Sequence, residues 1–278
     1  PVTGLFRWTP PEGARFGWHD VRVCVSDAGS PSLSATQDFR IWVAGLSPQG
    51  IPDLGTFDAL QLPELPVASG DRFAVRPSRG GELTVEAFFD DHWGNVLLTL
   101  LDDDGQVLGA SSPVSGGHRL DATVAAGTIY ELVVDGSNPA VRLRLTNLLA
   151  LSGSEAIVHG TDGDDTFAMA AGTVDHRVTV NGVRYDLQAA SLETIAFQAG
   201  QGTDAFQFTG TAGPESAEIW PDRARVTVGD SEVSVDHIES FSAVGGGGPD
   251  TVSFHASPGD DVFEGRPHFG SLQGPGFM

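Results

Sequence analysis

The sequence predicts an all-β protein, and three observations lead to that fold class. The chain has 278 residues with 36 Gly and 17 Pro, a composition typical of many tight turns. Short segments alternate apolar and polar residues with a period of two, which is the pattern of half-buried strands. Turn-forming clusters separate these segments, and long helix-period stretches with caps are lacking. The length is sufficient for about two domains with real hydrophobic cores.

Charge and cysteine content exclude several classes of function. There are 37 acidic residues against 15 basic ones, a formal net charge of −22, and every basic residue is Arg. This balance excludes a nucleic-acid-binding protein that works through a basic face, so no nucleic-acid partner is expected. Cys24 is the only cysteine, so the chain forms no internal disulfide and no thiolate metal cluster. Its apolar runs are too short to span a bilayer, and no membrane insertion is expected.

Residues 1–45 are predicted to hold strands over 18–25 and 37–43, separated by the turn-forming cluster 26–34. This segment resembles the C-terminal half of a bacterial cadherin-like or immunoglobulin-like repeat. The resemblance rests on the motifs Phe6-x-Trp8-x-Pro10, Gly17-x-x-Asp20-Val21-x-Val23, Val25-Ser26-Asp27-x-Gly29-x-Pro31-x-Leu33-Ser34 and Phe39-x-Ile41-x-Val43. It implies a calcium ligand at Asp27, although the acidic linker that cadherins place after the last strand is missing. The alternative is an Asp that closes a turn.

Residues 46–69 contain Pro48, Pro52, Pro63 and Pro66. Because proline cannot donate to a central β-ladder, this segment is predicted to be a linker or an extended arm.

Residues 70–149 form a second alternating set with turns at the spacing of a β-sandwich. They resemble a pre-peptidase C-terminal domain, a jelly-roll module of secreted bacterial proteins. The motifs are Gly81-x-Leu83-Thr84-Val85, Leu98-x-Leu100-x-Asp102-x-Asp104-Gly105, Leu108-x-x-Ser111 and Ala126-Gly127-Thr128-x-Tyr130-x-Leu132-x-Val134. The acidic run 102–105 is predicted to be a hairpin tip, because Leu100 and Ser111 stand where a helix–loop–helix calcium site needs acids.

Residues 150–278 contain an internal repeat. The segment 192–204 aligns with 238–250 at an offset of 46, and Val178-Thr179-Val180 aligns with Val226-Thr227-Val228 at an offset of 48. Asn181-Gly182 and Gly229-Asp230 follow, where hairpin turns are expected. A fixed period of this length predicts a β-solenoid in which each unit buries its apolar side on the next. The third unit is incomplete, so the sequence is expected to be a piece of a longer protein, with residues 70–149 and the array as separate units.

Within the repeats, a nonapeptide resembles the glycine- and aspartate-rich calcium repeat of RTX proteins. Residues 245–253 match it fully, 160–168 and 199–207 depart at one glycine, and 210–217 and 257–263 are degraded copies. The resemblance implies bound Ca²⁺ as a cofactor. Calcium needs about six to eight oxygens, more than one such loop supplies, so two loops must stack. The alternative is that glycine makes the turn and aspartate caps its free amides. The candidate metal ligands are Asp27, Asp162, Asp164, Asp165, Asp204, Asp250, Asp260 and Asp261.

These features predict a structural or adhesive module, secreted or at the cell surface of a bacterium and stabilised by calcium. The expected partner is a surface polysaccharide, another copy or another surface protein. No catalytic residues are assigned, because the His residues lack zinc spacing and no nucleophile motif is present, and the chain is not expected to be an enzyme. The second hypothesis is an accessory carbohydrate-binding region, or a solenoid groove, of a polysaccharide-active enzyme. Trp93 and Trp220 are its candidate sugar-stacking residues, although both are expected to pack in a core.

Overall fold

The computed structural model describes residues 17–27, 29–30, 32–43, 45–266 and 269–274. The all-β prediction is confirmed: 64% of the chain is strand and 2% is helix, and the helices in the described ranges are two single turns of 3₁₀-helix. Phe6, Trp8, Pro10 and Pro31, used in the cadherin-like motif, lie outside the described residues.

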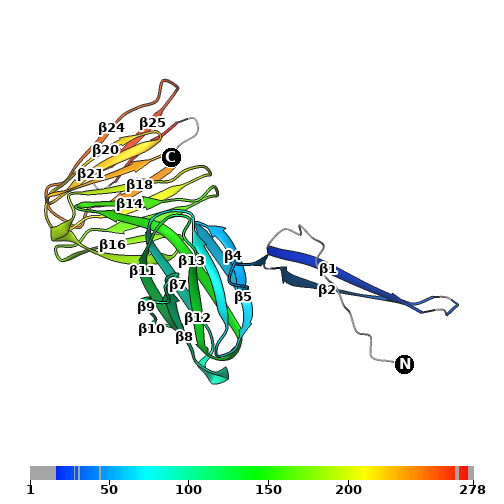
Figure 1. The fold of residues 1–278 in the computed structure, drawn as a ribbon. Coiled ribbons are helices and arrows are strands. Elements are labelled where there is room, and N and C mark those ends of the chain that lie inside the picture. The colour runs from blue at the N-terminus through cyan, green and yellow to red at the C-terminus, as the bar shows by residue number, and fades with distance from the viewer. Residues whose placement is uncertain (1–16, 28, 31, 44, 267–268, 275–278) are drawn as a thin grey trace.

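The N-terminal segment is a two-stranded ribbon. β1 (Gly17–Ser26) pairs antiparallel with β2 (Ser34–Val43), in a register that runs without interruption from Gly17 opposite Val43 to Ser26 opposite Ser34. Figure 1 shows this ribbon extending away from the rest of the molecule. In the described part of the chain no further strand joins its sheet, so the sequence-based strands are confirmed here as one hairpin.

A β-sandwich follows. One sheet runs in the order β3 (Gly45–Leu46), β4 (Pro52–Phe57), β6 (Arg72–Pro77), β12 (Tyr130–Gly136), β8 (Val96–Leu101) and β9 (Val107–Ala110). The facing sheet begins with β10 (Ser112–Val114), β11 (Gly117–Val124), β7 (Gly81–Phe88) and β13 (Asn138–Ser152), and β5 (Ala59–Val67) also pairs with β13. The inward residues of both sheets form one core, in which Leu83, Val85, Leu100, Leu132, Val134 and Leu143 are fully buried. The 3₁₀ turn η1 (Asp91–Trp93) lies between β7 and β8.

The segment 46–69, predicted to be a linker, instead belongs to the sandwich. β4 and β5 lie within it, and Leu54, Phe57, Leu62 and Val67 are buried in the sandwich core. Pro63 and Pro66 are tolerated because β5 pairs with β13 alone among the described strands, and the register shifts between Leu65 and Leu62. Proline is compatible with such edge strands and bulges. The linker prediction rested on the number of prolines and overlooked the apolar residues of β5, which alternate with exposed ones on either side of the register shift.

A repeat array follows the sandwich. Its first sheet column contains β14 (Glu155–His159), β18 (Thr194–Gln198) and β22 (Ser231–Asp236), which pair in parallel. The second contains β15 (Thr166–Ala170), β19 (Ala205–Thr209) and β23 (Ser240–Val244), also parallel. Phe167, Phe197 and Phe206 pack edge to face between the columns. The array core is thus separate from the sandwich core.

Equivalent strands of successive repeats lie in opposite sheets. In the first repeat, β15, β16 (Asp175–Val180) and β17 (Val183–Gln188) form an antiparallel meander in the second sheet. In the next repeat, β20 (Glu215–Trp220), β21 (Arg223–Val228) and β22 form the same meander in the first sheet, where β24 (Thr251–Phe254) pairs in parallel with β20. The predicted hairpin turns at 181–182 and 229–230 join these strands. The repeat therefore interchanges the two sheets at each step.

The remaining elements complete the array. η2 (Ala189–Ser191) links β17 to β18, and β25 (Val262–Arg266) pairs with β26 (Phe269–Gln273) as a separate hairpin.

The two bodies share one sheet. One edge of β13 pairs with β5 as far as Thr146 and with β14 from Leu149 onward, while its other edge pairs with β7. Asn147, buried at the changeover, donates its side-chain amide to the Glu82 carbonyl and accepts from the Arg79 amide. Figure 1 shows β13 passing from the sandwich to the array. The boundary expected at residue 149 thus lies inside a strand.

Candidate functional site

The candidate ligand Asp165 closes the turn 160–165 from inside. Its Oδ2 accepts the Thr161 backbone amide at 2.7 Å, and its Oδ1 accepts the Thr161 hydroxyl at 3.0 Å and the Asn181 side-chain amide. The Thr161 hydroxyl oxygen in turn accepts the Gly163 amide at 3.2 Å. Asp165 is buried, with 1% of its surface exposed. The turn therefore contains a carboxylate whose two oxygens both accept hydrogen bonds from protein donors.

A second turn, 199–204, stacks on the first. Asp204 Oδ1 accepts the Asp165 amide at 2.7 Å, and Asp164 Oδ1 accepts the Thr203 amide at 2.9 Å. Gly202 has φ +125°, and a Cβ there would lie 2.5 Å from the Gly163 carbonyl oxygen. Glycine is required at this position because the two turn backbones touch.

The same pair of turns recurs in the next repeat. Glu215 Oε1 accepts the Thr211 amide at 3.0 Å and the Thr211 hydroxyl at 2.6 Å, as Asp165 does with Thr161. Asp250 Oδ1 accepts the Glu215 amide at 3.0 Å, as Asp204 does with Asp165. The position of Gly248 repeats that of Gly202, with its Cβ site 2.6 Å from the carbonyl oxygen of the stacked turn. These turns lie where the chain crosses between the two sheets.

Sequence reasoning treated the turn with Glu215 as a degraded copy and missed the role of this residue. The signal was present as Gly-Thr-x-Gly-x-acid, which occurs at 160–165 and again at 210–215. A third related turn precedes β25, where Asp261 Oδ1 accepts the Ser257 hydroxyl at 2.8 Å and the Ser257 oxygen accepts the Gly259 amide. The hydroxyl residue and the final acid, more than the glycines, define this turn.

The other candidate acids lie apart from these contacts. Asp162 and Asp260 are exposed at the tips of their turns. Asp27 closes the β1–β2 loop, where its Oδ1 accepts the amides of Gly29 at 3.0 Å and Leu33 at 2.8 Å. These two bonds, with Leu33 the stronger cause, lower the pKa of Asp27. Asp27 therefore acts as the turn-closing residue that was one of its two predicted roles.

The placed acids act as hydrogen-bond acceptors within the turns. Asp164, Asp165, Asp204, Asp250 and Asp261 each accept a hydrogen bond from a turn amide or hydroxyl. Within the described ranges, no group of three or more His, Cys, Asp or Glu side chains has a metal-binding arrangement. Calcium needs about six to eight converging oxygens. The geometry therefore favours amide capping, and the calcium expectation stays a prediction.

The fold shifts the pKa of Asp204, the acid at the end of the second turn. Burial raises its pKa, and the nearby carboxylates of Asp165, Glu239 and Asp164 add to the rise, whereas the hydrogen bond from the Asp165 amide opposes it. Glu239 Oε2 accepts the Asp204 amide at 2.7 Å. The stacked turns thus concentrate negative charge in a buried place, which disfavours ionisation.

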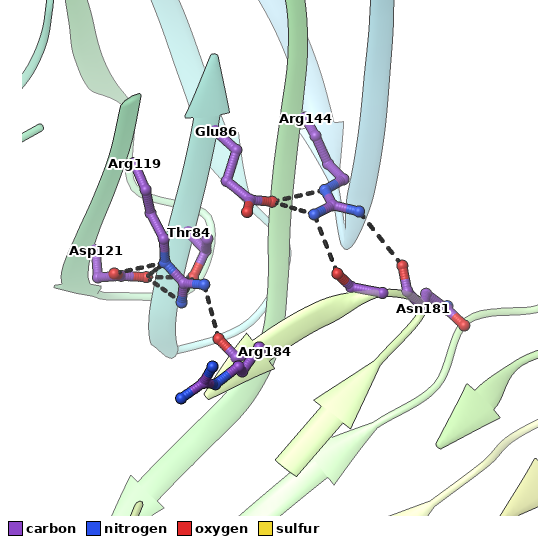
Figure 2. Close-up of polar contacts among 8 residues, drawn as sticks. Thr84, Glu86, Arg119, Asp121, Arg144, Asn181 and Arg184 are labelled. Atoms are coloured by element: carbon purple, nitrogen blue, oxygen red, sulfur yellow. Dashed lines mark hydrogen bonds and ion pairs between the residues drawn. The ribbon is translucent and has the colours of Figure 1, made fainter. Parts of the chain in front are cut away.

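A second polar cluster joins the sandwich to the array (Figure 2). Arg144 on β13 donates from Nε to Glu86 on β7 at 2.6 Å, and its terminal nitrogens reach the carbonyl oxygens of Asn181 at 3.5 Å and Gly182 at 3.2 Å. The side chains of Arg144 and Glu86 are only 18% and 9% exposed. One guanidinium thus links a sandwich carboxylate to a hairpin turn of the array.

A neighbouring arginine makes a parallel connection. Arg119 on β11 donates to both carboxylate oxygens of Asp121 and, from Nη1, to the Arg184 carbonyl oxygen at 2.7 Å. Its guanidinium also lies over the Tyr185 ring, 5.2 Å from the centroid. Thr84 completes the group by donating to Asp121 at 2.6 Å (Figure 2). Sequence reasoning did not single out either arginine, because alternation along a strand does not tell which outer face will be covered.

The two tryptophans weighed as sugar-stacking residues differ in exposure. Trp220 is half-buried, stacked on His255 at 4.5 Å and under the Arg223 guanidinium. Trp93 is 63% exposed. Core packing was expected for both, and this expectation is wrong for Trp93, because η1 carries it on the outside of the sandwich.

Comparison with known proteins finds no protein-family model and no curated protein that matches this chain. In the described ranges, no helix combines the length and the apolar character that a membrane span requires. The fold class therefore rests on the structure, and the function rests on the geometry of these sites.

Proposed function

We propose that this chain is a structural and adhesive module of a secreted or cell-surface bacterial protein, in which the sandwich and the array act as one rigid body. The observation that carries the proposal is the shared strand β13, which belongs to both bodies. Backbone ladders on both edges of β13 prevent it from acting as a hinge without breaking hydrogen bonds. A rigid body of this kind suits a role in which surfaces are held at a fixed separation.

The arginine contacts support the same proposal. Arg144 and Arg119 each pair with a sandwich carboxylate and donate to a backbone carbonyl of the β16–β17 hairpin or of β17. For the mostly buried Arg144–Glu86 pair, removing one partner costs about 3–5 kcal/mol, because the other charge remains uncompensated. The Arg119–Asp121 pair contributes less, because Asp121 is 40% exposed. Sliding of the array along the sandwich would break both links together, so the orientation is fixed by side chains as well as by β13.

Composition supports the proposed location. The strong acidity and the absence of an internal disulfide are compatible with a calcium-rich exterior and with a fold that does not depend on oxidation. Calcium stabilisation remains part of the proposal only as a weak effect, since the turn carboxylates already cap amides.

Rigidity is tested by measuring a distance across the junction. Spin labels at Ser115→Cys on the sandwich and Gln201→Cys on the array, with Cys24→Ser, should give one narrow distance distribution. Arg119→Gln with Arg144→Gln should broaden it, because both side-chain links are lost. Arg142→Gln is the matched control, since Arg142 is exposed on the same strand β13 and lies over Phe88. A broad distribution in the otherwise unchanged protein would contradict a rigid module.

A further inference from the structure

Trp93 lies beside a shallow hollow on the outer end of the sandwich. The hollow has a volume of about 250 Å³, and its walls include Pro66, Ala68, Asp71, Trp93, Ser137 and Pro139. These residues come from three places in the sequence, namely the segment from the end of β5 to the turn before β6, the turn η1, and the start of β13. The apolar walls are thus an indole and two proline rings, and the polar groups among the six are one carboxylate and one hydroxyl.

The loop that carries Trp93 is held firmly. Asp90 accepts the His92 amide at 3.0 Å, and the buried Asn138 donates to the carbonyl oxygens of Asp90 at 3.0 Å and Gly94 at 2.9 Å. His92 packs against the indole in an edge-on arrangement, with ring centroids 5.3 Å apart. The indole is therefore presented by an ordered backbone, which lowers the entropic cost of binding.

Trp93 differs from Trp220 in what covers it. Trp220 already stacks on His255 and lies under a guanidinium, so those contacts occupy its ring. Trp93 is 63% exposed beside the hollow. An exposed indole offers a flat apolar face and an N–H donor, the amphipathic character that makes Trp frequent at binding surfaces.

We propose that this hollow binds a neutral pyranose unit of a polysaccharide, with the sugar stacked on Trp93 and a hydroxyl hydrogen-bonded to Asp71. Asp71 uses Oδ2 to accept the Ala68 amide at 2.8 Å. Its Oδ1 has no protein donor in the described part of the chain and is available to accept a sugar hydroxyl. The exposed Ser137 hydroxyl lies in the same wall. An apolar platform with a few directional acceptors matches the amphipathic faces of a pyranose ring.

Charge and aromatic content select the class of ligand. The chain carries a net charge of −22. Asp90 and Asp91 shortly precede Trp93 in the sequence, and Asp135 shortly precedes Ser137. An acidic polysaccharide would therefore be repelled. A proline-rich peptide is disfavoured because such peptides dock in grooves lined by several aromatic rings, whereas Trp93 is the one aromatic residue of this wall. A neutral sugar satisfies both constraints.

A glycan array with neutral and acidic oligosaccharides, followed by calorimetric titration of the strongest binder, tests the proposal on the whole chain. Decaproline is included as a separate probe. Neutral glycans should bind and polygalacturonate should not. Trp93→Ala should weaken binding at least about tenfold, since the stacking platform is lost. Asp71→Asn should weaken it several-fold, and Val107→Ala, an equally exposed apolar residue on the same sandwich, should leave it unchanged.

Thermal melts of the variants separate loss of the ligand site from loss of the fold. Trp93→Ala should melt close to the unsubstituted protein, because the side chain is mostly exposed. Absence of binding across the neutral glycans, unchanged binding by Trp93→Ala, or binding of decaproline in their place would each overturn the proposal. The rigid-body function would stand in any of these cases, because the label distances measure it independently of a ligand.

Discussion

The sandwich and the array are both built from short strands, yet their turns use glycine and aspartate differently. At the sandwich turns, Gly105 and Gly127 have positive φ, and a Cβ at either would meet nothing within 4 Å. At the array turns, Gly202 and Gly248 also have positive φ, but a Cβ would meet the backbone of a neighbouring turn. Glycine therefore serves local backbone conformation at these two sandwich turns and close stacking at these two array turns.

The acids follow the same division. Asp102 caps the β8–β9 hairpin tip from the surface, where its Oδ1 accepts the amides of Asp104 and Gln106. Asp165 and Asp204 are buried and connect one turn to the next. A Gly-x-Gly-x-Asp pattern can thus arise from stacked turns with capped amides. Such a pattern is not by itself evidence of a metal.

The largest effect is expected from cutting the sandwich at residue 70. A fragment of residues 70–149 should fail to fold, because it lacks the core residues Leu54, Phe57, Leu62 and Val67 of β4 and β5. A fragment of residues 45–152 should show a cooperative urea transition. Circular dichroism and intrinsic fluorescence during a urea titration provide the measurement. A cooperative transition in the shorter fragment would restore the linker interpretation of 46–69.

The next largest loss of stability is expected from truncating a side chain in the array core. Phe197 is fully buried and contacts the rings of Phe167 and Phe206, so Phe197→Ala should cost about 3–5 kcal/mol of unfolding free energy. Phe263→Ala, in the same array but 60% exposed, should cost less than about 0.5 kcal/mol. Urea unfolding followed by circular dichroism compares the two. Equal losses of unfolding free energy would show that the rings packed between the two sheet columns do not form the array core.

Strand alternation made most of the fold predictable, whereas contacts between strands distant in sequence were not. The hairpin of β1 and β2, the strands of the sandwich and the hairpin turn at Asn181 all follow from local patterns. The sequence does not state that β13 changes partner near Asn147, or that Arg144 will meet a turn 37 residues away. The prolines of β5 misled because their tolerance depends on edge position, which is a tertiary property.

The candidate site was predictable in location but not in chemistry. The glycine pattern identified the turns correctly, yet it could not show whether Asp165 faces a metal or the Thr161 amide. That choice depends on which backbone donors lie within reach once the turns stack. Glu215 was missed because the repeat preserves hydrogen-bond geometry more closely than it preserves residue type.

Neutralising the buried cap tests the difference between the two kinds of turn. Asp165→Asn should cost about 1–3 kcal/mol, because its two oxygens accept different donors and an amide can satisfy only one of them. Asp102→Asn should cost less than about 0.5 kcal/mol, since one oxygen accepts both bonds and is retained. Thermal and urea melts of the two variants measure the contrast. A larger loss in Asp102→Asn would reverse the comparison drawn above.

At Asp204 a smaller change in the unfolding free energy is expected, and it is a gain of stability instead of a loss. Its pKa is raised in the folded protein, chiefly by burial, so its contribution to stability is present at acidic pH and is lost as pH rises through the folded pKa. Asp204→Asn retains Oδ1 as acceptor for the Asp165 amide and removes the charge. The variant should be at least as stable as the unsubstituted protein at pH 7, and its advantage should shrink as pH falls through the raised pKa of Asp204. Urea midpoints at several pH values decide this, and a clear loss at pH 7 would show that the charge is needed.

The smallest expected effect is that of calcium on the array. Extracellular-type sites have Kd values of about 10⁻⁴–10⁻³ M, and a ligand that binds the folded form alone stabilises it by RT ln(1 + [L]/Kd). At about 2 mM calcium this amounts to roughly 0.6–1.8 kcal/mol, or a melting shift of a few degrees. The amide donors to Asp165 and Asp250 and the Ser257 hydroxyl donor to Asp261 compete with calcium for the same oxygens and place the result at the low end. Calcium titrated into chelator-treated protein, with magnesium in parallel, gives the measurement. A variant with these three residues changed to Ala should lose any calcium-specific shift. An equal shift in that variant would leave the turns as hydrogen-bonded glycine turns and assign the calcium effect to another part of the acidic surface.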